Sequence, residues 1–141
     1  MNLTYKMLNK SKKILSEISA GELLDKISIL EIKLEKVKDK NSLEEIKKEH
    51  NILKEIQTSS IEIAGEIKDL YQSVKNVNIK LWNIEDKLRI CEKNKDFDKN
   101  FIELARAVYF ANDERAKLKS KINKILNSNI REIKQYDDYK I

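Results

Sequence analysis

The sequence predicts an all-α protein, folded as an antiparallel bundle of three to four long helices with coiled-coil-like heptad seams. The 141 residues include no proline and only two glycines, so few positions interrupt a helix. Charged residues make up 38% and hydrophobic residues 40%, which suits helices with one apolar and one charged face. The isoleucines and valines recur three and four residues apart rather than in alternation, which favours helices over strands.

Residues 1–18 are predicted to be an N-terminal amphipathic arm. Four lysines surround a few aliphatic residues, as in a short amphipathic helix or a frayed arm. Its apolar face is narrow, which gives only weak support for binding to a membrane surface. The first long helix is expected from Ser19, because Ser-Ala-Gly-Glu matches a capping box in which Ser19 and Glu22 bond each other's amides. An a/d seam follows at 4-3-4-3 spacing, at Leu23, Ile27, Leu30, Leu34 and Val37.

The central part of the chain contains one clear interruption and one ambiguous one. Residues 38–41 interrupt the seam, and Asn41 or Ser42 is predicted to cap the next helix. At residues 58–60, Thr-Ser-Ser either ends that helix, with Ser59 capping a new one, or lies inside a single helix of residues 43–92. Both alternatives stay open. From residue 63 the seam is regular, with Ile63, Ile67, Leu70, Val74, Val77, Leu81, Ile84, Leu88 and Cys91.

The last long helix is predicted at about residues 98–127, after a loop at 93–100. Its seam consists of Phe101, Leu104, Val108, Ala111, Arg115, Leu118, Ile122 and Ile125. Because the connections are short, neighbouring helices are expected to be antiparallel. Residues 19–127 would then form the bundle domain, and residues 128–141 a C-terminal tail that lies across it.

Composition argues against several classes of function. The single cysteine, Cys91, excludes an internal disulfide framework and is typical of a reducing compartment. No apolar run approaches the roughly 20 residues of a membrane span, and no secretory signal is recognisable, so a cytoplasmic location is expected. One histidine, His50, cannot supply the paired Glu-x-x-His motifs of a di-iron bundle. No catalytic residue, metal site or cofactor is predicted.

Polar residues interrupt the core side of the last helix. Asn112, Arg115 and Lys119 fall on the same side as Val108 and Leu118. Only four of the 29 basic residues are arginine, so each arginine is expected where a planar set of donors is needed. Buried charges need partners, and the available acids are Asp25, Glu31, Asp86 and Asp113. Three interpretations remain: a structural network, an anion pocket built on Arg115, Lys119 and Arg89, or exposure at a splayed bundle end.

The long helices also carry a second face that needs cover. At 100° per residue, Trp82, Asp86 and Arg89 share the side of their helix opposite the seam, where Asp86 and Arg89 can pair. The first helix has a similar face with Ile29 and Ile32. Large apolar residues on such faces would each lose roughly 1.5–3 kcal/mol of burial energy if exposed, so another helix, the tail or another chain should cover them. The candidate polar or ligand cluster drawn from these faces is Asp25, Trp82, Asp86, Arg89, Arg106, Tyr109, Asn112, Asp113, Arg115 and Lys119.

Three segments carry a resemblance to a known family. They are ISAGELLDKISILEIKLE at 18–35, LWNIEDKLRICE at 81–92 and FIELARAVYFANDERAKLKSKIN at 101–123. Together they resemble an uncharacterised family of small bacterial all-helical proteins with GELLDK, LWxIED and ARxVYxxNDxR motifs. The resemblance covers about half of the chain, and residues 1–17 look like an addition to it. It implies an all-helical fold with no established activity, and an association with glycosyltransferases of surface polysaccharides.

Two classes of function follow from these observations. The first is a non-enzymatic helical interaction or scaffold module, as a homo-oligomer or with a helical protein partner. The second is a protein or enzyme that binds an anionic small molecule, such as a sugar nucleotide or sugar phosphate, in surface polysaccharide synthesis. Nucleic-acid binding is less favoured: the net charge is +5, but the lysines are interleaved with glutamates, as on a solvated helix surface.

Overall fold

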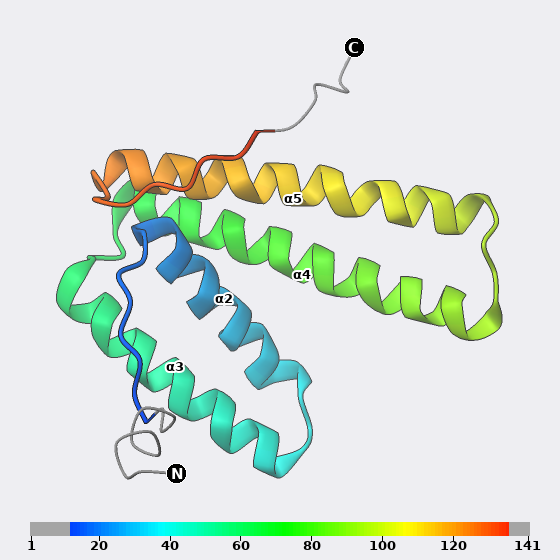
Figure 1. Cartoon of the computed structure of the whole chain (residues 1–141), viewed down its shortest axis with the longest axis horizontal. Helices are drawn as coiled ribbons and strands as arrows, with labels where there is room; N and C mark the ends of the chain where they lie inside the picture. The colour runs from blue at the N-terminus through cyan, green and yellow to red at the C-terminus, as the bar shows by residue number, and fades with distance from the viewer. Residues whose placement is uncertain (1–11, 136–141) are drawn as a thin grey trace, which may run out of the picture.

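The structure, a computed structural model, describes residues 12–135, which form four helices and no strand. The helices are α2 (Ala20–Lys36), α3 (Lys40–Ser60), α4 (Gly65–Asn94) and α5 (Lys99–Ile125). They pack as two antiparallel hairpins, α2–α3 and α4–α5, which lie at an angle to each other (Figure 1). The predicted all-α bundle of three to four long helices is confirmed. Among the described residues, no helix is both long and apolar enough to span a membrane.

Helix α2 is the centre of the bundle. It packs against each of the other three helices, whereas α3 packs only against α2. Both of its sides are therefore buried, and Leu24, Ile27 and Ile32 are at most 2% exposed. Ile32 lies on the second face of α2, for which the sequence alone did not identify a covering element. Other helices of the same chain cover it.

The start of α2 follows the sequence signal only in part. The Ser19 hydroxyl accepts a hydrogen bond from the Glu22 amide at 3.0 Å, as the capping box predicts. The Glu22 carboxylate, however, bonds Lys119 on α5. At the start of α3 the prediction of Asn41 or Ser42 as the cap is wrong. Asp39 caps this helix, because its extended backbone places the carboxylate where it accepts both the amide and the hydroxyl of Ser42.

The ambiguous segment 43–92 forms two helices. Helix α3 ends at Ser60, and the extended residues 61–64 lead into α4. Ser59 is not a cap; its hydroxyl bonds carbonyl groups within α3. The buried side chain of Gln57 donates to the carbonyl of Ile61 at 2.7 Å, which holds the break in place. Gly65 follows with φ of +57°, a conformation that glycine adopts without steric cost.

The α4–α5 hairpin is much longer than α2. Helices α4 and α5 have 30 and 27 residues, or roughly 40–45 Å, whereas α2 has 17 residues, or roughly 25 Å. The hairpin therefore continues past the end of α2 (Figure 1). We call residues 85–108 the distal arm. In this arm Cys91 of the α4 seam is buried, whereas Leu88 of the same seam and the facing α5 residues Phe101, Leu104 and Val108 are only half-buried.

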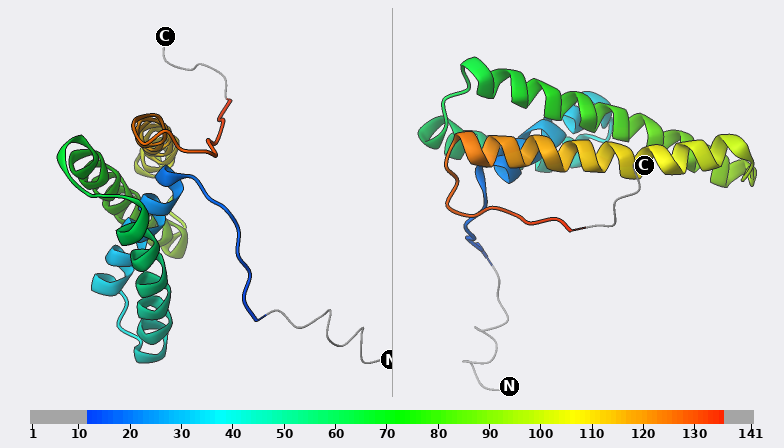
Figure 2. Two further views of the ribbon diagram at one scale, coloured as in Figure 1. Left: turned by 90° about the vertical axis from the view of Figure 1, so that its left-hand side faces the viewer. Right: turned by 90° about the horizontal axis from the view of Figure 1, so that it is seen from above.

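The two ends of the described chain are not helical. Residues 12–19 form an extended lead into α2, and residues 126–135 turn back along α5, as the two views of Figure 2 show. The predicted amphipathic arm is described only from residue 12, and residues 1–11 lie outside the described part. The tail is described as far as residue 135.

Candidate functional site

The centre of the polar cluster is Asp25, which lies on α2 and is 1% exposed. Arg115 of α5 donates to Asp25 Oδ2 from Nε at 3.2 Å and from Nη2 at 2.9 Å. The Lys119 ammonium lies 3.5 Å from the same oxygen. The buried carboxylate is thus matched by two cations from one face of α5, as a buried charge requires.

The second oxygen of Asp25 is also bonded. Asn78 of α4, 5% exposed, donates from its amide group to Asp25 Oδ1 at 2.8 Å and to the Ser28 hydroxyl at 2.8 Å. The Ser28 hydroxyl in turn donates to the Asp25 carbonyl at 2.7 Å. Asp25 therefore joins α2, α4 and α5 at one point.

A second ion pair lies one turn earlier on α2. The Glu22 carboxylate accepts from the Lys119 ammonium at 2.5 Å, and Lys26 lies 3.7 Å from its other oxygen. Burial raises the pKa of Glu22, but the hydrogen bond and charge of Lys119, with Lys26 and Arg115 nearby, outweigh it and hold this pKa below its ordinary value. We call Glu22, Asp25, Ser28, Asn78, Arg115 and Lys119 the polar junction.

A glycine allows the two helices to approach at this junction. A Cβ atom on Gly21 would lie 2.6 Å from the carbonyl oxygen of Lys119. The Gly21 amide donates to Asn123 Oδ1 at 2.6 Å, so the start of α2 is tied to the end of α5. Because both acids of the junction face both cations, its charges balance within the chain. The polar junction therefore holds α2 against α4 and α5 through ion pairs and hydrogen bonds.

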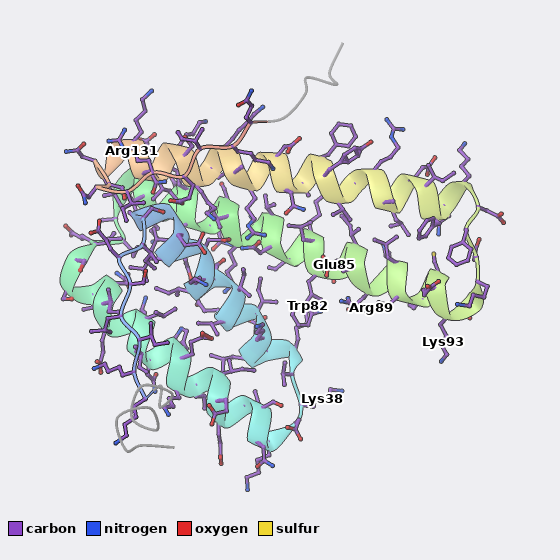
Figure 3. The ribbon with its side chains drawn as sticks, viewed as in Figure 1. Lys38, Trp82, Glu85, Arg89, Lys93 and Arg131 are labelled. Carbon is purple, nitrogen blue, oxygen red and sulfur yellow. The ribbon has the colours of Figure 1, made fainter. Side chains whose placement is uncertain are left out.

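Trp82 and Asn112 lie beside the junction. They line a small cavity of about 150 Å³ together with Arg115, and Ile29 and Ile32 of α2 close it from the other side. Figure 3 shows Trp82 pointing from α4 into the wedge between the two hairpins. Asp25, Trp82, Asn112, Arg115 and Lys119, from three helices, are thus brought together.

The other half of the candidate cluster lies elsewhere. Asp86 is exposed on α4, and Arg89 lies 3.7 Å from Glu85, one helical turn before it, so the Asp86–Arg89 pair considered from the sequence does not form. Arg106 lies over the ring of Phe110 at 5.8 Å, on the far side of α5 from Arg115. Neither arginine reaches the polar junction.

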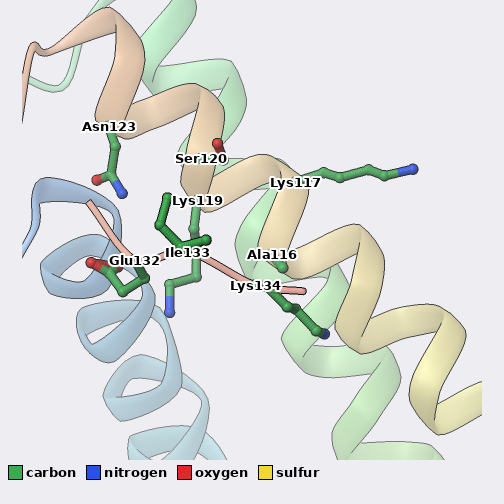
Figure 4. Close-up of a pocket in the computed structure, with 8 residues that line it drawn as sticks. All are labelled: Ala116, Lys117, Lys119, Ser120, Asn123, Glu132, Ile133 and Lys134. Atoms are coloured by element: carbon green, nitrogen blue, oxygen red, sulfur yellow. The ribbon is translucent and has the colours of Figure 1, made fainter. Parts of the chain in front are cut away.

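Asp113 and Tyr109 belong to the side of α5 that faces the tail. Asp113 is 4% exposed and accepts from Lys134 at 2.9 Å, while Tyr109 packs against Phe110. Between the tail and α5 lies a pocket of about 420 Å³ (Figure 4). In Figure 4, Lys119 points from this pocket toward α2, whereas Lys117 extends away. The tail therefore covers the outer side of the junction.

Sequence reasoning missed three members of the junction, and one of them, Ser28, carries no signal that separates it from other serines. Glu22 was assigned only to a helix cap, and Asn78 was not singled out. A signal for Asn78 exists, since it precedes Trp82 by four residues and so lies on the same face of α4. No local signal could reveal that Glu22 turns toward a lysine 97 positions away. Among the described residues, no group of three or more His, Cys, Asp or Glu could hold a metal ion.

A separate groove runs along the distal arm. Leu88, Phe97, Phe101 and Val108 line about 470 Å³, with the charged groups of Glu85, Arg89 and Glu92 at its edge. The rings of Phe97 and Phe101 meet edge to face, with centroids 5.2 Å apart. The groove lies on the side of α4 that carries Trp82, beyond the end of α2.

Comparison with known proteins identifies the family. The sequence model of a family of unknown function, DUF6165, matches residues 14–140. The chain belongs to DUF6165. No curated protein and no solved structure matches it. The DUF6165 match includes every residue of the polar junction and of the distal-arm groove, and it leaves residues 1–13 outside.

Proposed function

We propose that this DUF6165 chain is a non-enzymatic helical interaction module that pairs with a second copy of itself through the distal arm. The observation that carries this proposal is the groove of Leu88, Phe97, Phe101 and Val108, which continues beyond the end of α2. Nearer the junction, α2 fills the corresponding space between α4 and α5. The arm lacks such a helix, and a further helical layer would bury its half-exposed aromatic residues.

Charge favours a second copy as the occupant. Two acids, Glu85 and Glu92, and one base, Arg89, lie along one edge of the groove. In a two-fold dimer the same surface meets itself, so a surface that carries both signs can be complementary to itself. Arg89, whose side chain is 73% exposed, can then face a glutamate of the second copy. Two α4–α5 arms would together form a four-helix bundle.

Sedimentation velocity over a concentration series tests the proposal. We expect a monomer–dimer equilibrium that Phe97→Ser weakens by about tenfold or more, because an aromatic anchor is lost. Phe97 lies in the loop between the helices, so this change should leave the helical content intact. The matched control is Ile90→Ser, because Ile90 is equally prominent, 58% exposed, but projects from α4 roughly opposite Leu88 and Glu92.

A charge exchange tests the arrangement itself. Arg89→Glu alone should weaken the dimer, because like charges then meet. Glu85→Lys combined with Glu92→Lys should do the same, and mixing the two variants should restore association as a heterodimer. A wild-type protein that stays monomeric at roughly 0.3 mM would overturn the proposal. Equal loss of association in the Ile90→Ser control would also contradict it.

Anion binding beside Arg115 is the second candidate function. Its support is the cavity that Trp82, Asn112 and Arg115 line together. Its volume of about 150 Å³ is well below the roughly 300–1,000 Å³ of common ligand sites. Moreover, Asp25 already neutralises Arg115. A thermal-shift screen of sugar phosphates and nucleotides tests it: a shift that Arg115→Lys abolishes would support an anion site, and no shift with any of them would argue against one.

A further inference from the structure

The positive charge of this chain is concentrated at one end of the sequence. Residues 1–16 contain four lysines and no aspartate or glutamate, so they carry four of the five units of net positive charge. In the remaining 125 residues, 25 basic side chains face 24 acidic ones. The family match begins at residue 14, so this basic segment lies almost entirely outside it. The helical domain itself is nearly neutral.

The described end of this segment also exposes large aliphatic side chains. Ile14 is 81% exposed and Leu15 is 82% exposed, and both directly follow the exposed Lys12 and Lys13. Both side chains line the edge of a groove on the domain, yet each stays more than four-fifths exposed. Exposure of this degree, next to consecutive lysines, indicates an apolar partner with a negatively charged surface.

The adjoining surface of the domain extends the apolar patch. A groove of about 620 Å³ lies between residues 14–19 and the second half of α3. Ile52 and Ile56 of α3 line it and are 52% and 46% exposed. Helix α3 packs only against α2, so no other helix of the described chain covers this side. Segment and groove together form one apolar surface.

We propose that residues 12–16 bind the surface of an anionic lipid bilayer, with Ile14 and Leu15 entering the boundary between headgroups and acyl chains. Lys12 and Lys13 lie next to the inserted pair, and Lys6 and Lys10 add charge to the sequence that precedes them. Basic charge alone or a short apolar stretch alone gives weak, reversible binding, whereas the two together reinforce each other. The protein thereby attaches to a membrane from one side, and the helical domain stays in water.

Lipid explains the pattern better than nucleic acid does. Binding to a phosphate backbone requires cations, but it gains nothing from two exposed aliphatic residues. Single-stranded nucleic acid would instead be expected to use aromatic residues for stacking. Ile14 and Leu15 have no such capacity, whereas acyl chains accept them readily.

Vesicle co-sedimentation of the full chain tests the proposal. We expect binding to vesicles in which about a third of the lipid is phosphatidylglycerol, little binding to phosphatidylcholine alone, and weaker binding at high salt. Lys12→Glu with Lys13→Glu should weaken binding about tenfold or more. The matched control is Lys80→Glu with Lys87→Glu, which changes two exposed lysines of α4 and gives the same net charge. This control should retain most of the binding.

The aliphatic pair provides the second variant. Ile14→Ser with Leu15→Ser should also weaken vesicle binding about tenfold while leaving the circular dichroism spectrum unchanged, because both residues lie outside the helices. Equal binding to neutral and anionic vesicles, or equal loss in the α4 control, would overturn the proposal. So would tight binding to an RNA oligonucleotide that depends on Lys12 and Lys13 but not on Ile14 and Leu15.

Discussion

Asp25 and Arg115 lie 90 positions apart in the chain, and two nitrogen atoms of the guanidinium bond one oxygen of the buried carboxylate. This pair fixes α2 against α5, and Asn78 joins α4 to the same carboxylate. The contact explains why a core-facing position of α5 carries arginine: a buried acid on the central helix requires a cation there. It also makes the position of α2 sensitive to single substitutions.

The first prediction concerns the charge of Asp25. Asp25→Asn should lower the free energy of unfolding by about 3 kcal/mol, because Arg115 and Lys119 then lack their buried counter-charge. Urea denaturation measures the change. The control is Asp86→Asn, on the exposed surface of α4, which should stay within about 0.5 kcal/mol of the wild type. A loss for Asp25→Asn as small as the one expected for Asp86→Asn would mean that the charge of Asp25 adds nothing to stability.

The second prediction concerns the two glycines, which serve different purposes. Gly21→Ala should destabilise the protein by about 1–3 kcal/mol despite the helix preference of alanine, because the new methyl group meets the Lys119 backbone at 2.6 Å. Gly65→Ala meets no atom, so its cost of about 1–2 kcal/mol arises from the left-handed backbone alone. Gly65→Asn should recover part of that loss, whereas Gly21→Asn should not. Thermal denaturation distinguishes these outcomes.

The third prediction concerns acid stability. The folded-state pKa of Glu22 lies below its ordinary value of 4.5, so its stabilising effect is complete above that pH and is lost as the pH falls through the lower folded-state value. Glu22→Gln should therefore be less stable than the wild type at neutral pH, and the difference should shrink as the pH falls below 4.5. Urea midpoints measured across this range test it. A difference that is constant with pH would contradict the ion pair with Lys119.

The fourth prediction distinguishes the observed cap of α3 from the one expected from sequence. Asp39→Ala should lower the melting temperature, because Ser42 loses the acceptor of both its amide and its hydroxyl. Asn41→Ala should change it little. The hydrogen bonds from Ser42 also hold the pKa of Asp39 below its ordinary value, so the effect of Asp39→Ala should decrease as Asp39 becomes protonated at acidic pH. A larger loss for Asn41→Ala would place the cap at Asn41.

Several elements could be read from the sequence because their signals are local. The seam of α4 is buried at Ile67, Val74 and Ile84, as its spacing predicts, and Ser19 caps α2. These features depend on residues three and four positions apart, which are neighbours in any helix. Even the break after Ser60 was visible as an alternative. It could not be decided, because the bond from Gln57 to Ile61 that stabilises it leaves no periodic pattern.

The sequence by itself determined that the chain forms long amphipathic helices and that Arg115 and Lys119 lie on the core side of the last one, where they need acidic partners if they are buried. Only the tertiary structure decided that Asp25 and Glu22 are those acids, that Arg89 pairs with Glu85, and that α2 covers the Trp82 face. The reason is physical. Periodicity fixes which side of a helix is apolar, but the helix lengths and crossing angles fix which sides meet, and these depend on all the contacts at once.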